Sequence, residues 1–230
     1  MPKKTSKLKL YVDSAEVNDW KIYLPTGIFH GVTTNPKLLA KSGIDFKINQ
    51  LAELANTAFS LGANEIHLQV WGQETEKMLE VGRQLAGIDP RVMVKVPINF
   101  AGILCAKTLV SEGTNVTLTA VHSTQQVLTA IALGVRYAAP YLGRMNDGGV
   151  DGMEEVAAMG RIVKVMKSPL RLLVASIRQN SDLVTLASRG LTTFTLLPAL
   201  IEDLLENKLT AQAAESFDAA VQESKGHKFK

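Results

Sequence analysis

Residues 91–100, RVMVKVPINF, place a lysine among the valines of a segment that otherwise has the composition of a buried strand. Side chains of a strand alternate between its two faces, so Met93 and Lys95 share one face and the three valines share the other. A continuous valine face is typical of a parallel strand covered by helices. The segment therefore predicts a strand that turns a lysine toward its second face, and the rest of the chain decides what that face meets.

Seven other segments have a similar β-rich composition and alternate with amphipathic stretches along the chain, as repeated βα units do. Eight strands with helices between them, in 230 residues, favour a single (β/α)8 TIM barrel of the α/β class over an open doubly wound sheet. The glycine-rich nucleotide-binding motifs of open sheets are also missing from the sequence. The predicted strands are LKLYVD (8–13), IFHGVT (28–33), EIHLQVW (65–71), RVMVKV (91–96), NVTLTAV (115–121), VRYAAP (135–140), RLLVAS (171–176) and TTFTLL (192–197).

Helical patterns fill the intervals, for example over 45–61 and 74–86, and a final amphipathic segment over about 198–224 predicts an extra C-terminal helix. No stretch has the composition of a linker between domains, so one barrel domain is expected over 1–230. Residues 1–7 and 225–230 are rich in lysine and are predicted to be flexible basic tails. The final segment has more apolar surface than a barrel wall requires, which predicts a homo-oligomer.

Composition excludes several classes of function. The net charge is +3, but seven lysines lie within the first nine and last six residues, so the basic character belongs to the ends and a nucleic-acid partner is not expected. No apolar run approaches the roughly 18–20 residues that span a bilayer, and no signal peptide is recognisable, so we expect a cytoplasmic protein without a membrane partner. The one cysteine, Cys105, is expected to pack in the core. The four histidines lack metal-ligand spacing, and neither a metal nor another cofactor is expected.

Polar residues follow the predicted strands in succession. Because the carboxyl ends of barrel strands meet at one mouth, these side chains are expected to form one polar pocket. They are Asp13, Thr33, Thr34, Asn35, Gln69, Lys95, Thr117, Thr119, Tyr141, Arg144, Ser176 and Arg178.

Lys95 has two interpretations at this stage. It could form a buried salt bridge, for which Asp13 is the candidate partner. It could also be a nucleophile that forms a Schiff base with a carbonyl substrate, because a barrel interior removes the water that keeps an ordinary lysine charged. Imine chemistry also needs proton transfers, and Tyr141, Gln69 and Thr119 are candidates to hold the water involved, with Asp13 as a further partner.

A phosphate site is predicted beyond the later strands. Arg144, Ser176 and Arg178 lie where many barrels of this type bind phosphate. The alternative for the two arginines is a surface ion pair.

Several of these segments together resemble the transaldolase family. GVTTNPKLLAKSG (31–43) is similar to its signature, and VMVKVP (92–97) resembles its Schiff-base strand; YVDSAEV (11–17), APYLGRMNDGG (139–149) and LLVASIRQ (172–179) follow in the family order. The resemblance is closest to the short members, fructose-6-phosphate aldolases and small transaldolases. It implies a class I aldolase that carries a dihydroxyacetone unit on Lys95.

The same resemblance implies roles for other residues. Asp13 corresponds to the acid/base aspartate and Asn35 to the asparagine that contacts the dihydroxyacetone portion. Thr119 corresponds to the threonine that helps hold the catalytic water. Arg144 and Ser176 correspond to the phosphate-binding pair, and Arg178 would be a second cation.

Two residues bear on the choice within the family. Transaldolases typically have glutamate at the position of Gln69 and phenylalanine at that of Tyr141, whereas fructose-6-phosphate aldolases have glutamine and tyrosine. We therefore expect reversible cleavage of fructose 6-phosphate to dihydroxyacetone and glyceraldehyde 3-phosphate. The alternatives are a transaldolase, which Arg178 and the LGRMND segment favour, and an inactive barrel that binds sugar phosphates. His122 stands where both groups usually have an aromatic residue, and the sequence does not decide whether it reaches the pocket.

Overall fold

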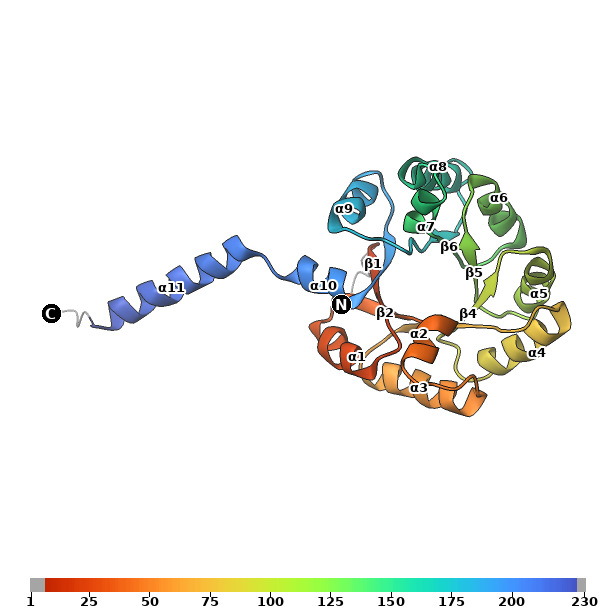
Figure 1. Cartoon of the computed structure of the whole chain (residues 1–230), viewed down its shortest axis with the longest axis horizontal. Helices are drawn as coiled ribbons and strands as arrows, with labels where there is room; N and C mark the ends of the chain where they lie inside the picture. Colours follow the sequence, from red (N-terminus) through yellow and green to blue (C-terminus); the bar gives the residue numbers. More distant parts are fainter. Residues whose placement is uncertain (1–6, 227–230) are drawn as a thin grey trace.

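Eight parallel strands form one sheet that curves into a barrel, as the sequence predicts (Figure 1). The computed structural model describes the backbone of residues 7–226 and the side chains of residues 7–222. Neighbouring strands follow one another around the sheet, and β1 lies between β2 and β8. The strands are β1 (Lys9–Asp13), β2 (Phe29–Thr33), β3 (Glu65–Gln69), β4 (Val92–Pro97), β5 (Val116–Val121), β6 (Tyr137–Pro140), β7 (Arg171–Leu172) and β8 (Thr193–Leu196).

The barrel closes between β7 and β8, where regular pairing is shortest. Strand β7 has two residues, but the chain beyond it stays extended, and Val174 forms a parallel bridge with Phe194. The Val174 amide donates to the Thr193 carbonyl at 2.9 Å, and the Thr195 amide donates to the Val174 carbonyl at 2.9 Å. The predicted strand over 171–176 is therefore present as a short ladder continued by single bridges.

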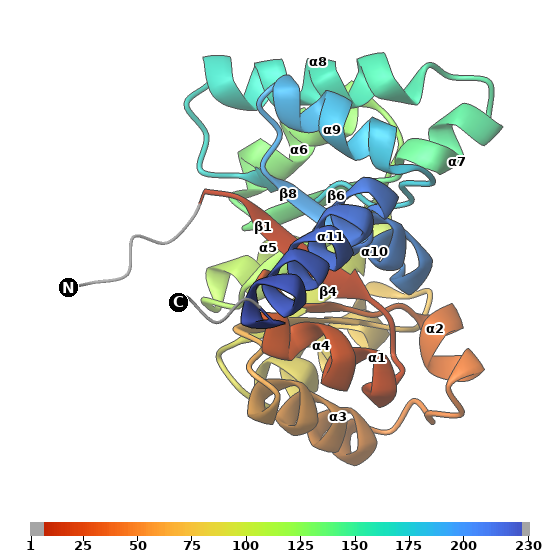
Figure 2. The same cartoon turned by 90° about the vertical axis from the view of Figure 1, so that its left-hand side faces the viewer.

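Helices surround the sheet and cover its outer face (Figures 1 and 2). The stretches predicted as helical over 45–61 and 74–86 form α3 and α4. The helices are α1 (Val17–Tyr23), α2 (Pro36–Lys41), α3 (Ile48–Ser60), α4 (Thr75–Ala86), α5 (Phe100–Ser111), α6 (Thr124–Leu133), α7 (Leu142–Asp147), α8 (Gly152–Val165), α9 (Asn180–Ser188), α10 (Pro198–Leu205) and α11 (Lys208–Gly226), with a 3-10 turn, η1 (Leu24–Thr26), after α1.

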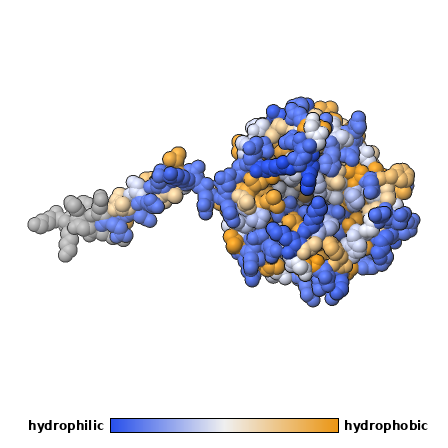
Figure 3. Space-filling view, in the orientation of Figure 1, coloured by the Kyte–Doolittle hydropathy of each residue, from blue (hydrophilic) through white to orange (hydrophobic). Residues whose placement is uncertain are grey.

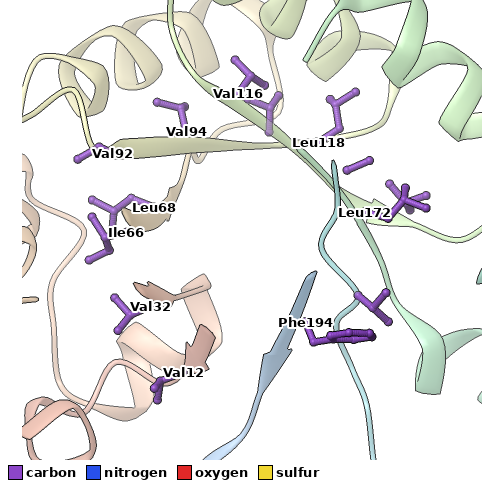
Figure 4. Close-up of a cluster of buried hydrophobic side chains, with 14 of the residues drawn as sticks. Val12, Val32, Ile66, Leu68, Val92, Val94, Val116, Leu118, Leu172 and Phe194 are labelled. Atoms are coloured by element: carbon purple, nitrogen blue, oxygen red, sulfur yellow. The ribbon is translucent and has the colours of Figure 1, made fainter. Parts of the chain in front are cut away.

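The apolar core lies between the strands and these helices. Figure 4 shows outward-facing strand side chains that pack there, among them Val12, Val94 and Phe194, each completely buried. Cys105 of α5 is buried in the same core. Each fully buried aliphatic side chain of this kind contributes about 1.5–3 kcal/mol relative to an exposed one. The opposite strand face points into the barrel, so polar side chains in the other register are gathered in its interior.

Strand β2 approaches β3 too closely for a side chain at one position. A Cβ atom at Gly31 would lie 2.0 Å from the Glu65 carbonyl oxygen. Gly31 faces Glu65 in the parallel ladder, and this pair is on the inner face of the barrel. A glycine is required here because the two backbones occupy the space that a methyl group would need.

The barrel has two ends, and the end at which the strands begin is called the lower end here. It is filled by a buried ionic cluster around Glu65, the first residue of β3. Its carboxylate accepts hydrogen bonds from Tyr11 at 2.6 Å and Tyr137 at 2.7 Å, and it pairs with Lys9 at 3.1 Å and Arg136 at 2.8 Å. Burial by itself would raise the pKa of Glu65, but the side chains of His30 and His67, together with the Tyr11 and Tyr137 hydroxyls, outweigh it and hold the pKa well below its usual range. Glu65 is therefore an anion that neutralises the cations beside it.

His67 lies above this cluster and is completely buried. Burial lowers its pKa from 6.5 to about 4, with further lowering by the positive charges of Lys95 and Lys9, although Glu65 opposes the shift. Its Nδ1 lies 3.0 Å from the Thr117 hydroxyl. A neutral imidazole thus separates Glu65 from the upper half of the barrel.

The C-terminal segment differs from the prediction of one helix over 198–224. The backbone becomes extended at Glu206, and Asn207 starts a new helix by accepting hydrogen bonds from the Leu209 and Thr210 amides at 3.0 and 3.2 Å. Such a side-chain cap satisfies amides that have no partner in the first turn, so it favours a new helix start. Helix α10 stays against the barrel, and α11 extends away from it (Figure 1).

The predicted flexible tails lie almost entirely outside the described residues. Of 1–7 only Lys7 is described, and of 225–230 only Lys225 and Gly226, at the end of α11. No helix within the described part of the chain is long and apolar enough to cross a membrane.

The buried neutral state of His67 predicts a specific pH dependence of stability. A histidine whose pKa is lower in the folded state than in the unfolded chain takes up a proton on unfolding. The free energy of unfolding should therefore fall as pH falls from 6.5 toward 4, by a contribution on the order of 3 kcal/mol. Urea unfolding at a series of pH values measures it.

The matched comparison is His67→Gln, which keeps a polar side chain but cannot titrate. Its free energy of unfolding should lose this part of the slope between pH 7 and pH 5, whatever its absolute stability. Equal slopes for the two proteins over that interval would show that His67 is not held neutral.

Candidate active site

A cavity of about 580 Å³ opens at the carboxyl ends of the strands, where the sequence predicts the pocket. Ala139 and Leu173 form part of its floor, and they belong to an apolar layer inside the barrel together with Tyr11, Met93 and Tyr137. This layer separates the cavity from the Glu65 cluster. Eight of the predicted site residues line the cavity: Asp13, Thr33, Asn35, Gln69, Lys95, Tyr141, Arg144 and Ser176.

Lys95 reaches the cavity from the inner face of β4 and is 5% exposed. Its amine donates a hydrogen bond to the Thr34 carbonyl at 2.6 Å. No carboxylate lies within ion-pair distance of Lys95 among the described residues, so the direct salt bridge with Asp13 is not formed. The amine is therefore fixed toward the end of β2 while one side of it faces the cavity.

Asp13 lies at the end of β1 and accepts a hydrogen bond from the Thr33 hydroxyl at 2.7 Å. The Thr33 oxygen lies 2.5 Å from the Thr195 hydroxyl, so three strands contribute to one hydrogen-bonded group. Burial raises the pKa of Asp13, although the charge of Lys95 and the Thr33 hydrogen bond act in the opposite direction. A carboxylate with a raised pKa is a stronger base than an exposed one, which suits it to take a proton from a hydroxyl group.

Gln69 lies on β3, between β2 and β4, whereas Thr119 and Tyr141 lie on the other side of Lys95, on β5 and just after β6. Gln69 faces Lys95 in the β3–β4 ladder. The Thr119 hydroxyl lies 2.7 Å from the Tyr141 hydroxyl, which joins the end of β5 to the residue that follows β6. Thr119 is buried and does not line the cavity, so it contacts the pocket through Tyr141.

A bulge in β5 sets up this arrangement. Ala120 has a left-handed backbone with φ of 59°, and the β5–β6 register shifts between Leu118 and Val121. The extra residue lets Thr119 face the interior while Val121 packs with the outer core. Left-handed alanine is strained, and such strain tends to lie where function requires it.

Thr34 has a different position from the one that a substrate-contacting residue would need. Its amide and its hydroxyl both donate to the His67 carbonyl, at 3.1 and 3.0 Å, and its side chain is fully buried. The adjacent Asn35 lines the cavity and caps α2 by accepting from the Lys37 and Leu38 amides at 3.0 and 3.1 Å. Thr34 thus anchors the turn that carries the carbonyl partner of Lys95.

The predicted phosphate residues divide into two groups. Arg144 and Ser176 both line the cavity, and Ser176 has a left-handed backbone with φ of 58°. A Cβ atom at Gly143 would lie 2.5 Å from the Ser176 carbonyl oxygen, so a glycine lets the first turn of α7 approach the backbone of Ser176. Arg178 does not line the cavity and forms an ion pair with Asp147, which holds the pKa of that carboxyl below its usual range. The surface ion pair, which the sequence left open, is thus formed by Arg178.

Two ionisable residues that line the cavity, His122 and Lys37, were outside the predicted site. His122 lies with its ring 5.5 Å from that of Tyr141 at an angle of 71°, and its Nδ1 is 2.8 Å from the Ala120 carbonyl. The alternative that it packs beneath the pocket is therefore wrong. Lys37, in the first turn of α2, lines the opposite side. The lysine in the TTNPK segment was the available signal for it, but a solvated surface lysine has the same pattern.

Comparison with known proteins identifies the family. The family model described as Transaldolase/Fructose-6-phosphate aldolase matches residues 10–230. The chain belongs to this family. A protein named probable transaldolase from Exiguobacterium sibiricum is 32% identical over 212 residues, which cover 91% of this chain and 96% of that protein. Probable transaldolases from Halalkalibacterium halodurans and Cereibacter sphaeroides are 33% and 34% identical, covering 91% and 92% of this chain and 97% and 94% of theirs.

Solved structures that resemble this barrel show the fold alone. A thiamine phosphate pyrophosphorylase from Pyrococcus furiosus aligns with a TM-score of 0.56 at 15% identity, covering 83% of this chain and 86% of that one. A mandelate oxidase variant aligns with a TM-score of 0.58 at 14% identity, covering 84% and 64%. Family membership makes this chain an enzyme of the transaldolase/aldolase class, and the predicted resemblance is confirmed.

Proposed function

We propose that this member of the family is a cytoplasmic class I aldolase that cleaves fructose 6-phosphate reversibly to dihydroxyacetone and glyceraldehyde 3-phosphate. The observation that carries the proposal is the amine of Lys95, buried at the pocket floor with no carboxylate paired to it among the described residues and with one side toward the cavity. Arg144 and Ser176 would bind the substrate phosphate at the far wall, and Asn35 would contact the dihydroxyacetone portion.

In the first step, the Lys95 nitrogen adds to the C2 carbonyl of the sugar, and the carbonyl oxygen leaves as water, which gives an imine. The protonated imine then withdraws electrons from the neighbouring carbons. Asp13 takes the proton of the C4 hydroxyl, the C3–C4 bond breaks, and its electron pair moves between C3 and C2 to form an enamine. Glyceraldehyde 3-phosphate is released as the C4 hydroxyl becomes an aldehyde.

The second half of the reaction returns the lysine. The enamine takes a proton at C3, water adds at C2, and the C2–nitrogen bond breaks to release dihydroxyacetone. Gln69 and the Tyr141–Thr119 pair would hold that water and move its protons, because an amide and a phenol can both donate and accept hydrogen bonds.

The alternative activity is transaldolase, in which the enamine attacks a second sugar-phosphate aldehyde and is not protonated. In that reaction the dihydroxyacetone unit of sedoheptulose 7-phosphate would be transferred to glyceraldehyde 3-phosphate, leaving erythrose 4-phosphate and fructose 6-phosphate. The names of the similar proteins favour this activity. The phenol of Tyr141, bonded to Thr119 beside the pocket, favours hydrolysis because it adds a proton donor next to the enamine.

Trapping should place the covalent intermediate on Lys95. Incubation with fructose 6-phosphate and borohydride should reduce the imine and leave a sugar adduct on that residue, identified by peptide mass spectrometry. Lys95→Met should form no adduct and lose essentially all cleavage activity. Lys107→Met is the control, because Lys107 is on α5 outside the cavity, and it should be labelled at Lys95 like the parent protein. An unlabelled Lys95 would remove both enzyme activities.

The two activities differ in their need for an acceptor. If the enamine is protonated, the enzyme should form glyceraldehyde 3-phosphate from fructose 6-phosphate over many turnovers without added erythrose 4-phosphate. Tyr141→Phe should reduce this cleavage by about 10²-fold and reduce transfer to erythrose 4-phosphate much less, since the lost phenol serves the hydrolytic branch. Turnover that requires erythrose 4-phosphate would make the chain a transaldolase, and equal losses in the variant would remove the role given to Tyr141.

We also propose that α11 packs on a second copy of the chain. Leu209 and Phe217 of this helix are 74% and 70% exposed, and the described part of the helix projects away from the barrel (Figure 1). Figure 3 shows hydrophobic and hydrophilic residues interspersed along it. Most of the stability of helices in proteins comes from packing of their apolar side chains, so packing against a partner would stabilise α11.

Size-exclusion chromatography with light scattering tests this assembly. The parent chain should elute as a homo-oligomer, and Phe217→Asp should shift it toward the monomer. Gln212→Asp, which adds the same charge at an exposed position on a different side of α11, should leave the mass unchanged. A parent chain that is monomeric at tens of micromolar would contradict the proposal.

A further inference from the structure

Two cations lie at opposite walls of the cavity. Lys37 follows β2 and Arg144 follows β6, and these strands are four apart in a sheet of eight, so they face each other across the barrel. Neither side chain makes an ion pair or hydrogen bond with another side chain among residues 7–222. Asp147 is near enough to Arg144 to feel its charge, but the ion pair of Asp147 is with Arg178.

The charge of the cavity is unbalanced as a result. Asp13 is the carboxylate that lines it, and the charge of Lys95 acts on Asp13 directly. Arg144 at one wall is assigned to the substrate phosphate in the proposed function. Lys37 at the other wall is left without a counter-ion, and an exposed ammonium at the edge of a polar pocket binds phosphate or carboxylate groups readily.

The position of the reacting amine relates these two cations to the substrate. Lys95 Nζ is held 2.6 Å from the carbonyl of Thr34, three residues before Lys37. A ketone bound through C2 has two substituents that diverge by about 120° at a planar carbon. If the chain from C3 onward runs toward Arg144 and Ser176, then C1 points to the β2 side, where Lys37 lies.

We propose that Lys37 forms a second anion-binding position, so that the pocket takes ketose phosphates with a further phosphate or carboxylate at C1. This inference rests on the proposed function for the placement of C2 and of the first phosphate. It extends the substrate class from sugar monophosphates to doubly anionic ketoses. The residue that would distinguish the two classes is Lys37, because it lies on the β2 side of the cavity, where C1 would be placed.

Binding of polyol phosphates tests the site without the imine. Glucitol 6-phosphate and glucitol 1,6-bisphosphate have no carbonyl, so their dissociation constants, measured by calorimetry at about 0.1 M salt, do not depend on Lys95 as a nucleophile. The parent protein should bind the bisphosphate at least about tenfold more tightly than the monophosphate. Lys37→Gln should bring this ratio close to one, and Lys37→Arg should keep most of it.

Lys41→Gln is the matched control. It removes the same charge from the last turn of α2, where the side chain is exposed and outside the cavity, and it should leave the ratio unchanged. A ratio near one in the parent protein would overturn the proposal. If Lys37→Gln weakened the binding of the monophosphate and the bisphosphate equally, the proposal would also fail, because Lys37 would then attract anions without recognising a group at C1.

These outcomes are separate from those of the catalytic proposal. If borohydride leaves Lys95 unlabelled but the ratio depends on Lys37, the aldolase assignment fails and the second anion position stands. If Lys95 is labelled but the ratio is near one, the aldolase assignment stands and the second position is absent.

Discussion

A strand sends successive side chains to opposite faces, and in a closed barrel one of those faces encloses a narrow interior. That constraint places Val92, Val94 and Val96 under the helices and Lys95 inside. The same alternation turns Asp13, Thr33 and Gln69 inward from three other strands. The site is therefore assembled from polar residues of separate strands and is not contained in one sequence motif. Every further property of the pocket depends on this division between the faces.

The interior is stratified along the barrel axis. The lowest layer is ionic and centres on Glu65, which is buried; one carboxylate oxygen accepts from the two tyrosine hydroxyls and the other from Lys9 and Arg136. Above it lies the apolar layer with Tyr11, Tyr137 and Leu173, and the reactive groups lie at the top. Removing one partner of a buried charge pair typically destabilises a protein by about 3–5 kcal/mol, so the ionic layer is stable only while the Glu65 carboxylate keeps its partners. It is sustained because tyrosine hydroxyls and two cations surround the same carboxylate.

Much of this could be predicted from the sequence, because strands and inward polar residues follow simple periodicity. The eight strands, the barrel and the inward direction of Lys95 were derived in that way. Periodicity could not predict the β5 bulge, since Ala120 has no sequence signal for a left-handed backbone. It also could not predict that Arg178 would be neutralised by Asp147 or that Asn207 would divide the C-terminal segment, because both depend on local hydrogen-bond partners.

The layered interior also determines how molecules reach the reactive amine. With Tyr11, Met93 and Tyr137 packed across the barrel, the pocket is blind at its lower end, and the open mouth is shared by every molecule that arrives or leaves. In the proposed reaction the three-carbon unit stays tethered to Lys95 while the aldehyde is free. The aldehyde must therefore depart before a second aldehyde or a water molecule can take its place, which imposes an order of release without any moving gate.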